Sequence, residues 1–349
     1  MKPFHKALVP VVVALTTTFG GCLLNAEAAT FRKLRSIENE NRPRYVTAGN
    51  PAHSVVNLGT GFDGVVDLLI KTDSENFGCS GSLLTSGRHI LTAAHCFTDG
   101  SQNIIANSIQ AFFSLPTGST SIKSANLFIH SDWSDNFTII NGDIAIIELA
   151  SEAPVAAERY DIYRGTDEVG KIGIKVGYGY SGNGNEGDIS SDGLKRLGKN
   201  IYDAPGEILS KLPELETFPF PSTVLAYDFD NGLPANDAFG VHFGISDTGL
   251  GLDEINSAAG DSGGPTFING LIAGITSFGT CYGYPDCSGS DIDNILNSSF
   301  GEFSVDTRVS TYANWIDSIL SRPATVPEPS TIGAVLLAGF VALRYRKKL

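Results

Sequence analysis

Short β-branched runs separated by turn residues constrain the fold of this chain more than any other feature. Clusters of Gly, Asn, Asp and Ser lie between these runs, a pattern typical of antiparallel strands joined by turns. The 39 Gly, against one Met and two Trp, also favour a turn-rich β protein over a helix bundle. The sequence therefore predicts an all-β fold. The runs are residues 65–70, 90–92, 144–149, 172–176 and 271–278.

One segment near the end departs from this pattern. Over residues 310–320, Tyr312, Trp315, Ile316 and Ile319 recur at spacings of three and four, the period of an α-helix. Ser and Thr at the start of the segment can cap its N-terminus. The sequence therefore predicts a closing C-terminal helix.

Composition excludes several classes of protein. The 349 residues suffice for one large domain or two of ordinary size. Hydrophobic residues at 42% can form a core, and charged residues at 18% are too few for a disordered chain. The net charge is −14 although both ends are basic, so the body between them is more acidic still. Electrostatic binding of nucleic acid or of an anionic membrane face is excluded on this ground.

The N-terminus has the pattern of a secretory leader. Two lysines precede the apolar run 7–15, and the small-x-small sequence AEA follows at residues 26–28. This order predicts a signal peptide over residues 1–28, cleaved after the second alanine of AEA. The alternatives are lipoprotein processing at Cys22 and a short core helix. The polar stretch 29–44 is expected to be a linker or propeptide.

The C-terminus is a segment of three parts, residues 323–349. VPEPS at residues 326–330 precedes the nearly apolar run 331–343, and an Arg/Lys cluster ends the chain. This pattern resembles the PEP-CTERM sorting signal of Gram-negative exporting bacteria. The resemblance implies transient anchoring in the inner membrane, with the basic cluster cytoplasmic, and removal of the tail by an exosortase-type enzyme. The protein would then reach the cell surface or medium; a permanent single-span anchor is the alternative.

Cysteine usage agrees with export. Cys22 lies in the leader, which leaves an even number for an oxidising compartment and favours two disulfides. Three connectivities are possible, and Cys79–Cys96 with Cys281–Cys287 closes the shortest loops. A zinc site is the competing explanation, but the spacings contain no C-x-x-C pair.

Three short motifs contain residues that can carry chemistry together. His95 lies in LTAAHC, Asp143 in GDIA, and Ser262 in GDSGGP. A serine hydroxyl needs an imidazole to take its proton, and the imidazole needs a buried carboxylate to orient it. Glycines beside the serine free backbone N–H groups for an oxyanion. Singly, each residue has an ordinary structural explanation, whereas together they would require three coincidences.

The order and wording of these motifs resemble the trypsin-like (chymotrypsin-fold, S1-type) serine endopeptidases. CSGSL at residues 79–83, TSFG at 276–279 and the segment 308–316 also match that family in order. The resemblance spans about residues 55–320 and predicts a protease domain over residues 45–322. It implies two antiparallel Greek-key β-barrels with the active site between them, followed by a C-terminal helix.

The resemblance also implies roles for individual residues. His95 would act as general base and then as general acid, and Asp143 would orient it. Ser262 would be the nucleophile, and the backbone N–H groups of Gly260 and Ser262 would form the oxyanion hole. Polypeptides are then the expected substrates, and the oligomeric state is not predicted.

The substrate-binding positions depart from trypsin itself. Ser277 matches the residue that hydrogen-bonds near the aspartate, and Gly279 the residue that pairs with substrate backbone. Asn256 stands where trypsin has a carboxylate, so strong attraction for a basic P1 side chain loses its source. Ser304 replaces a wall glycine and Asp306 an aromatic residue near the pocket floor. We expect uncharged P1 side chains of small to medium size, with Asp306 as the group that could restore attraction for Lys or Arg.

Cysteine positions agree with the family only in part. Family position implies that Cys79–Cys96 clamps the histidine loop. The cysteine usual before the oxyanion loop is Ala258 here, so Cys281 lacks its family partner and Cys287 is the expected substitute.

Activation and loop lengths also differ from the family pattern. Asp261 could receive a newly exposed N-terminus, for which YVTAG at residues 45–49 is a weak match. Residues 179–252 are longer than in compact members, which predicts surface insertions, and the Gly-rich stretch 179–193 is expected to be a loop.

Two motifs point to cofactors that the context does not support. GYGYSG at residues 177–182 satisfies G-x-G-x-x-G, but no helix follows, so dinucleotide binding is not expected. DFDNG at residues 228–232 hints at a calcium loop but lacks its later ligands, so a solvated turn is the preferred interpretation. No cofactor is expected, and calcium bound at this loop is the weaker alternative. A surface or matrix protein that uses a protease-like fold for binding, with little activity, is the alternative to an enzyme.

Overall fold

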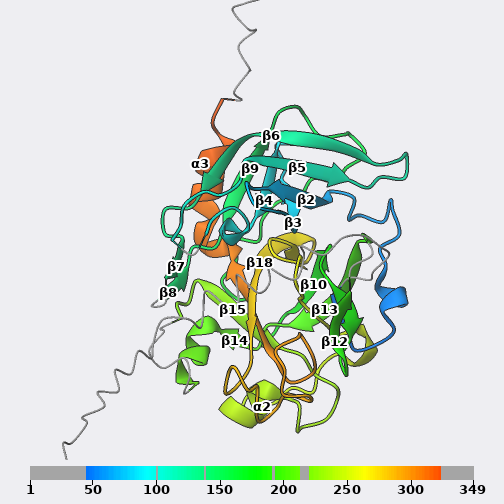
Figure 1. The fold of residues 1–349 in the computed structure, drawn as a ribbon, viewed down its shortest axis with the longest axis vertical. Helices are drawn as coiled ribbons and strands as arrows, with labels where there is room; N and C mark the ends of the chain where they lie inside the picture. The colour runs from blue at the N-terminus through cyan, green and yellow to red at the C-terminus, as the bar shows by residue number, and fades with distance from the viewer. Residues whose placement is uncertain (1–44, 100, 137–138, 191–192, 213–219, 324–349) are drawn as a thin grey trace, which may run out of the picture.

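A computed structural model describes residues 45–99, 101–136, 139–190, 193–212 and 220–323. The expected leader, the linker and nearly all of the sorting segment lie outside these residues. Within the described part of the chain, no helix is long and apolar enough to cross a membrane. The described chain forms two β-sheet halves stacked one above the other (Figure 1).

The first half is a closed barrel with the strand order β2-β3-β4-β9-β6-β5. Its neighbouring strands are all antiparallel, and β2 buries alternate residues such as Leu68 and Ile70. Closure removes the free edges that an open sheet would expose. The strands are β2 (Val65–Lys71), β3 (Asn76–Leu83), β4 (His89–Thr92), β5 (Ser108–Phe113), β6 (Thr120–Ile129) and β9 (Ala145–Leu149).

The second half has a seven-stranded sheet, β13-β10-β17-β18-β19-β15-β14, beside a four-stranded sheet, β12-β11-β1-β16. All pairings between these named strands are antiparallel except β1 with β11. The strands of the larger sheet are β10 (Ile172–Gly177), β13 (Arg196–Ile201), β14 (Ala204–Pro205), β15 (Val224–Asp228), β17 (Pro265–Ile268), β18 (Leu271–Thr280) and β19 (Phe303–Arg308). Those of the smaller sheet are β1 (Tyr45–Thr47), β11 (Ser181–Asn183), β12 (Gly187–Ser190) and β16 (Ile255–Asn256).

The predicted all-β class is confirmed, but the second barrel is only a half-barrel. Backbone pairing does not join the two outer strands of the larger sheet, β13 and β14. Instead, the Asn200 side chain donates from Nδ2 to the carbonyl oxygens of Asp228 (2.8 Å) and Ile255 (3.0 Å). A side-chain amide of β13 therefore links this strand to the end of β15 and to β16 of the smaller sheet.

The prediction of a loop over residues 179–193 is wrong in part. This stretch contains the hairpin of β11 and β12, whose tight turn has Gly187 at φ 69°, a value that glycine tolerates. The same glycine-rich composition that predicts a loop serves here to turn a hairpin.

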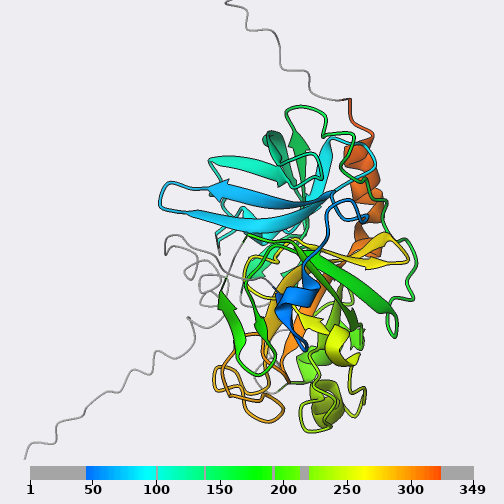
Figure 2. The same ribbon diagram turned by 90° about the vertical axis from the view of Figure 1, so that its right-hand side faces the viewer.

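The C-terminal helix is present and ties the two halves together. A 3-10 turn, η6 (Val309–Tyr312), leads into α3 (Ala313–Leu320), which lies beside the first barrel (Figure 1). Ile316 and Ile319 are buried in the same hydrophobic cluster as the strands of that barrel. After the second half, the chain thus returns to pack against the first barrel. Figure 2 shows this arrangement from another side.

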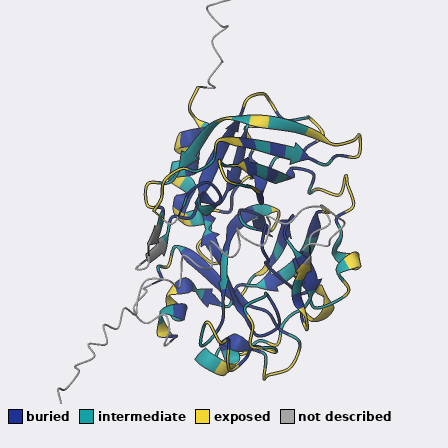
Figure 3. Cartoon of the chain, in the orientation of Figure 1, coloured by how far each residue is buried: buried dark blue, intermediate teal, exposed yellow. Residues whose placement is uncertain are grey.

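Buried residues run through both sheets and through the junction between them (Figure 3). Short elements lie around this core. They are η1 (Pro51–Ser54), η2 (Ala94–Cys96), β7 (Ser134–Asn136), β8 (Ile139–Asn141), η3 (Gly206–Lys211), α2 (Ala238–Phe243) and η5 (Gly251–Asp253).

Candidate active site

His95 and Asp143 meet in the first barrel, as the motifs predict. His95 lies in η2 directly after β4, and Asp143 precedes β9, the strand paired with β4. His95 Nδ1 lies 2.7 Å from Asp143 Oδ2, and the His95 backbone N–H donates to Asp143 Oδ1 at 2.9 Å. The carboxylate therefore fixes both the ring and the backbone of the histidine.

Asp143 is held in its charged form. The group is 2% exposed, and burial by itself raises its pKa. The charge and hydrogen bonds of His95, together with the hydroxyl of Ser277, outweigh burial and lower the pKa of Asp143 below its ordinary value. Thr307 Oγ1 also donates to the Asp143 carbonyl oxygen at 2.8 Å, which anchors this residue to the second half.

Ser262 lies on the turn that leads into β17, and strands of both halves hold it. Its carbonyl oxygen accepts from the Ser80 N–H of β3 at 2.8 Å. The following residue, Gly263, donates from its N–H to Thr276 O of β18, also at 2.8 Å. Ser262 itself remains partly exposed.

The turn also packs against the segment that carries the histidine. A Cβ on Gly263, at φ 80°, would lie 2.1 Å from Thr92 Oγ1, so only glycine permits this approach. Thr92 lies three residues before His95, and Thr276 is followed by Ser277, the donor to Asp143. The structure therefore brings the serine turn to the same junction as the histidine and the aspartate.

The backbone at Gly260 is shaped to leave N–H groups available. Gly260 has φ 92°, and its carbonyl oxygen accepts from Ser80 Oγ at 3.0 Å. The same Ser80 hydroxyl accepts from the Tyr178 N–H at 2.9 Å. Among the described residues, the N–H groups of Gly260 and Ser262 have no hydrogen-bond partner. They match the expected oxyanion donors.

The G-x-G motif at residues 177–179 packs against the buried carboxylate of Asp261. The Gly179 N–H donates to Asp261 Oδ1 at 2.6 Å, and the Ala258 N–H donates to Asp261 Oδ2 at 3.1 Å. A Cβ on Gly177 would lie 2.5 Å from Asp261 Oδ1, and one on Gly179 would lie 2.4 Å from its Cγ. The glycines thus make room for a buried carboxylate beside the serine.

Three of the predicted pocket residues lie together. Asn256 Oδ1 accepts from Ser257 N–H (2.9 Å) and Ser304 Oγ (2.6 Å). Ser304 faces Gly279 across the β18–β19 pair, and a Cβ on Gly279 would lie 3.7 Å from Ser304 Oγ. Because a backbone N–H can only donate, the amide orientation of Asn256 is fixed, and its buried Nδ2 has no partner among the described residues.

Asp306 is paired with a lysine inside the second half. Its fully buried carboxylate forms an ion pair with Lys175 Nζ at 2.7 Å and accepts from Tyr202 OH at 2.6 Å and from Thr266 Oγ1. Burial lowers the pKa of Lys175, and Asp306 opposes that effect. The charge of Asp306 is therefore matched by Lys175 inside the half-barrel, and its Oδ1 is buried with no partner among the described residues.

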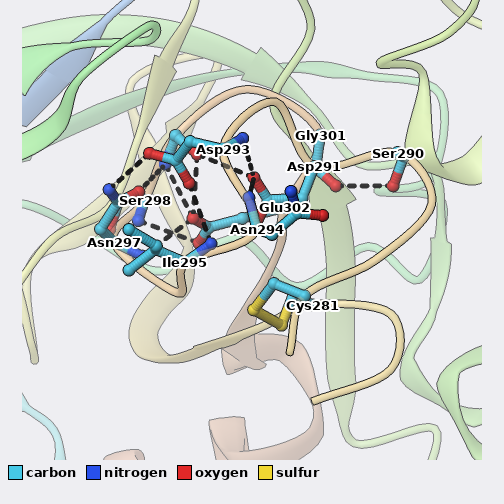
Figure 4. The surroundings of a disulfide bond; sticks show 12 residues. Cys281, Ser290, Asp291, Asp293, Asn294, Ile295, Asn297, Ser298, Gly301 and Glu302 are labelled. Carbon is cyan, nitrogen blue, oxygen red and sulfur yellow. Dashed lines mark hydrogen bonds between the residues drawn. A yellow bond between two sulfur atoms is a disulfide. The ribbon is translucent and has the colours of Figure 1, made fainter. Parts of the chain in front are cut away.

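Both predicted disulfides are present. Cys79–Cys96 (S–S 2.03 Å) joins β3 to η2, next to His95, and Cys281–Cys287 closes the start of the loop that follows β18. Figure 4 shows this loop folded around the Glu302 carboxylate, which accepts the N–H groups of residues 297–299. The loop therefore has its own polar core beside the second disulfide.

Two residues of the site were missed at the sequence level. Ser80 adjoins Cys79 in the CSGSL motif, and only the fold reveals that its hydroxyl reaches Gly260 across the junction. Lys175 had a visible signal, because it is the only charged residue in the run IGIKVG of β10. A lone lysine in an otherwise apolar strand indicates a buried partner of opposite charge.

Comparison with known proteins agrees with this architecture. The Trypsin family model matches residues 62–214, which include His95 and Asp143 but end before Ser262. A putative peptidase of Corynebacterium glutamicum is 22% identical over 275 residues, covering 78% of this chain and 75% of that protein. A chymotrypsin of Phaedon cochleariae is 23% identical over 254 residues, covering 72% of this chain and 75% of that protein.

A solved structure shows the same fold. Mouse neuropsin, a serine protease expressed in the limbic system of the brain, matches with a TM-score of 0.54 at 16% identity, covering 77% of this chain and 98% of that one. The chain has the chymotrypsin fold. Together with the sequence matches, this fold supports a trypsin-like peptidase.

Proposed function

We propose that this protein is a secreted serine endopeptidase. Ser262 attacks the scissile carbonyl carbon while His95 takes the hydroxyl proton, and Asp143 stabilises the imidazolium that forms. The N–H groups of Gly260 and Ser262 bind the oxyanion. His95 then gives the proton to the leaving amine, and water releases the acyl group from Ser262 by the same steps.

One observation carries this proposal. His95 Nδ1 and Asp143 Oδ2 lie 2.7 Å apart, at the junction where both halves hold the Ser262 turn. A core histidine with a purely structural role would not need, at the same junction, a partly exposed serine and two N–H groups without partners among the described residues. The sequence matches to peptidases support the same class of reaction.

A fluorophosphonate probe tests the proposal directly, because it reacts only with an activated serine. We expect labelling of the wild-type protein and none of Ser262→Ala. Ser318→Ala, a change at an exposed serine of α3, is the matched control and should label normally. No labelling of folded wild-type protein would favour the alternative, a surface or matrix protein that binds partners with a protease-like fold.

The pocket supports cleavage after uncharged P1 residues of small to medium size. The Asn256 amide N–H donors have no partner among the described residues, and a guanidinium or ammonium group can only donate, so it cannot pair with them. The nearby carboxylate of Asp306 is already paired with Lys175. A cleavage profile on a peptide library checks this preference, and dominance of Arg or Lys at P1 would contradict it.

Export and sorting complete the proposal. The leader pattern supports removal of residues 1–28, and the PEP-CTERM-like tail supports transient inner-membrane anchoring followed by exosortase-type cleavage near residues 327–329. Mass spectrometry of protein from the cell surface and medium should find an N-terminus at Ala29 or beyond, and no peptide from the Arg/Lys cluster. An intact tail in the mature protein would favour a permanent anchor.

A further inference from the structure

Three buried carboxylates converge in the second half, outside the candidate active site. Asp228 ends β15, Asp230 follows two residues later, and Asp237 precedes α2 at the end of the molecule away from the first barrel (Figure 1). Each is at most 3% exposed. One oxygen of each carboxylate lies within 4.8 Å of an oxygen of the other two. The expected solvated turn is therefore wrong for Asp228 and Asp230.

Nothing in the described structure balances the charge of these groups. Among the described residues, no ion pair includes Asp228, Asp230 or Asp237. The Oδ1 atom of Asp230 is buried and has no hydrogen-bond partner in the described chain. Burying carboxylates in this way is costly unless a proton or a cation neutralises them.

Neighbouring acids increase the demand for a cation. The Glu254 carboxylate accepts the Asp230 N–H at 2.8 Å, and Asp203 accepts the Asp228 N–H at 3.3 Å. These hydrogen bonds bring two further acidic side chains to the cluster, and a bound cation would offset the repulsion between the carboxylates.

We propose that Asp228, Asp230 and Asp237 bind one calcium ion. The donors are all oxygens, which hard cations prefer, and no nitrogen or sulfur ligand is present to favour zinc or copper. Calcium accepts irregular sets of carboxylates, whereas magnesium requires a near-octahedral arrangement and keeps its waters. A divalent ion would also supply the positive charge that the described structure lacks at this point.

Backbone hydrogen bonds already position two of the ligands. The Phe239 N–H donates to Asp228 Oδ2 at 2.8 Å, and the Gly240 N–H donates to Asp237 Oδ1. Of the three ligands, Asp230 has a buried oxygen, Oδ1, with no hydrogen-bond partner among the described residues. Binding would therefore fix the loop of residues 229–236 between β15 and α2, next to the strand pair β15–β19 that carries Ser304.

Equilibrium dialysis and thermal unfolding test the site without relying on activity. The full chain is used as Ser262→Ala, so that any self-digestion cannot obscure the result. We expect one calcium ion per chain, with a Kd of about 10⁻³ M or tighter. A hundredfold excess over Kd should raise Tm by about 5–10 °C, and magnesium should raise it far less.

Single substitutions locate the ion. Asp230→Asn and Asp237→Asn should abolish both calcium binding and the Tm response; asparagine retains the capping ability that Asp237 provides to α2. Asp253→Asn, at an exposed residue paired with Lys199, is the matched control and should bind normally. No saturable binding by the unsubstituted site at about 10⁻² M calcium, roughly tenfold above the weakest expected Kd, overturns the proposal, even if a variant fails to fold. Unchanged binding by folded Asp230→Asn also overturns it.

Discussion

Two buried carboxylate sites in this molecule have opposite surroundings. In the first barrel, Asp143 accepts hydrogen bonds from His95 and Ser277, and its pKa lies below the ordinary value. In the second half, Asp230 lies among other acids with no ion pair to a described Lys or Arg, and burial raises its pKa to about 9. The difference shows that burial alone does not decide the charge of a carboxylate. The partners that the fold places around it do.

The largest expected effect comes from removing the charge at the first site. Asp143→Asn should lower kcat by about 10⁴-fold with little change in fold, because His95 loses the acceptor that fixes its tautomer. Peptide hydrolysis and the rate of fluorophosphonate labelling measure the loss. Asp253→Asn should leave both unchanged, and equal losses in the two variants would contradict the distinct role of Asp143.

Replacing Lys175 in the half-barrel shows how much stability is lost when a buried carboxylate has no cation beside it. Lys175→Met should lower the free energy of unfolding by about 3–5 kcal/mol, because Asp306 is left buried and unpaired. Urea denaturation measures this change. The double variant Lys175→Met/Asp306→Leu should recover most of the stability; if it does not, packing rather than charge explains the loss.

The two sites should respond to pH in opposite directions. The pKa of Asp230 is raised in the folded protein, so without calcium this carboxyl group loses its proton at lower pH in the unfolded chain than in the folded chain. The free energy of unfolding of the calcium-free protein therefore falls between about pH 4 and pH 9, by up to about 1.4 kcal/mol per pH unit for each such group. The lowered pKa of Asp143 gives stability that is present above its unfolded pKa and lost as pH falls below about 4.

Urea midpoints measured in EDTA between pH 5 and pH 8 check the predicted fall in stability due to Asp230. Asp143 stays charged throughout that range and does not contribute to the change. We expect stability to fall with rising pH, and Asp230→Asn to reduce the slope. An unchanged slope in Asp230→Asn would show that the acidic cluster does not control it.

The smallest expected effect concerns the link across the junction. Ser80→Ala removes the hydroxyl between Tyr178 N–H and Gly260 O, leaving two buried polar groups unsatisfied. The cost of about 1–3 kcal/mol should appear in the free energy of unfolding. We also expect a lower kcat with little change in KM, because Ser80 holds the backbone that carries the oxyanion donors. A change confined to KM would contradict this role.

Much of the fold and site could be predicted from local sequence. Strands such as β2 and β18 follow from β-branched runs, and α3 from its helical spacing, because these patterns reflect a single buried face. The positions of His95, Asp143 and Ser262 follow from short motifs. The open half-barrel could not be predicted in this way, because strand pairing and side-chain links such as those of Asn200 to Asp228 and Ile255 join residues far apart in sequence.

The sequence by itself determined which groups are available: the three motif residues, the cysteines, and the acidic stretch around Asp228. Only the tertiary structure decided which of these groups meet. Asp306 pairs with Lys175 from a strand 131 residues away, and Asp228 and Asp230 are buried rather than solvated. The physical reason is that charge and hydrogen bonding depend on neighbours distant in sequence, whereas local patterns report only whether a residue faces a core or solvent.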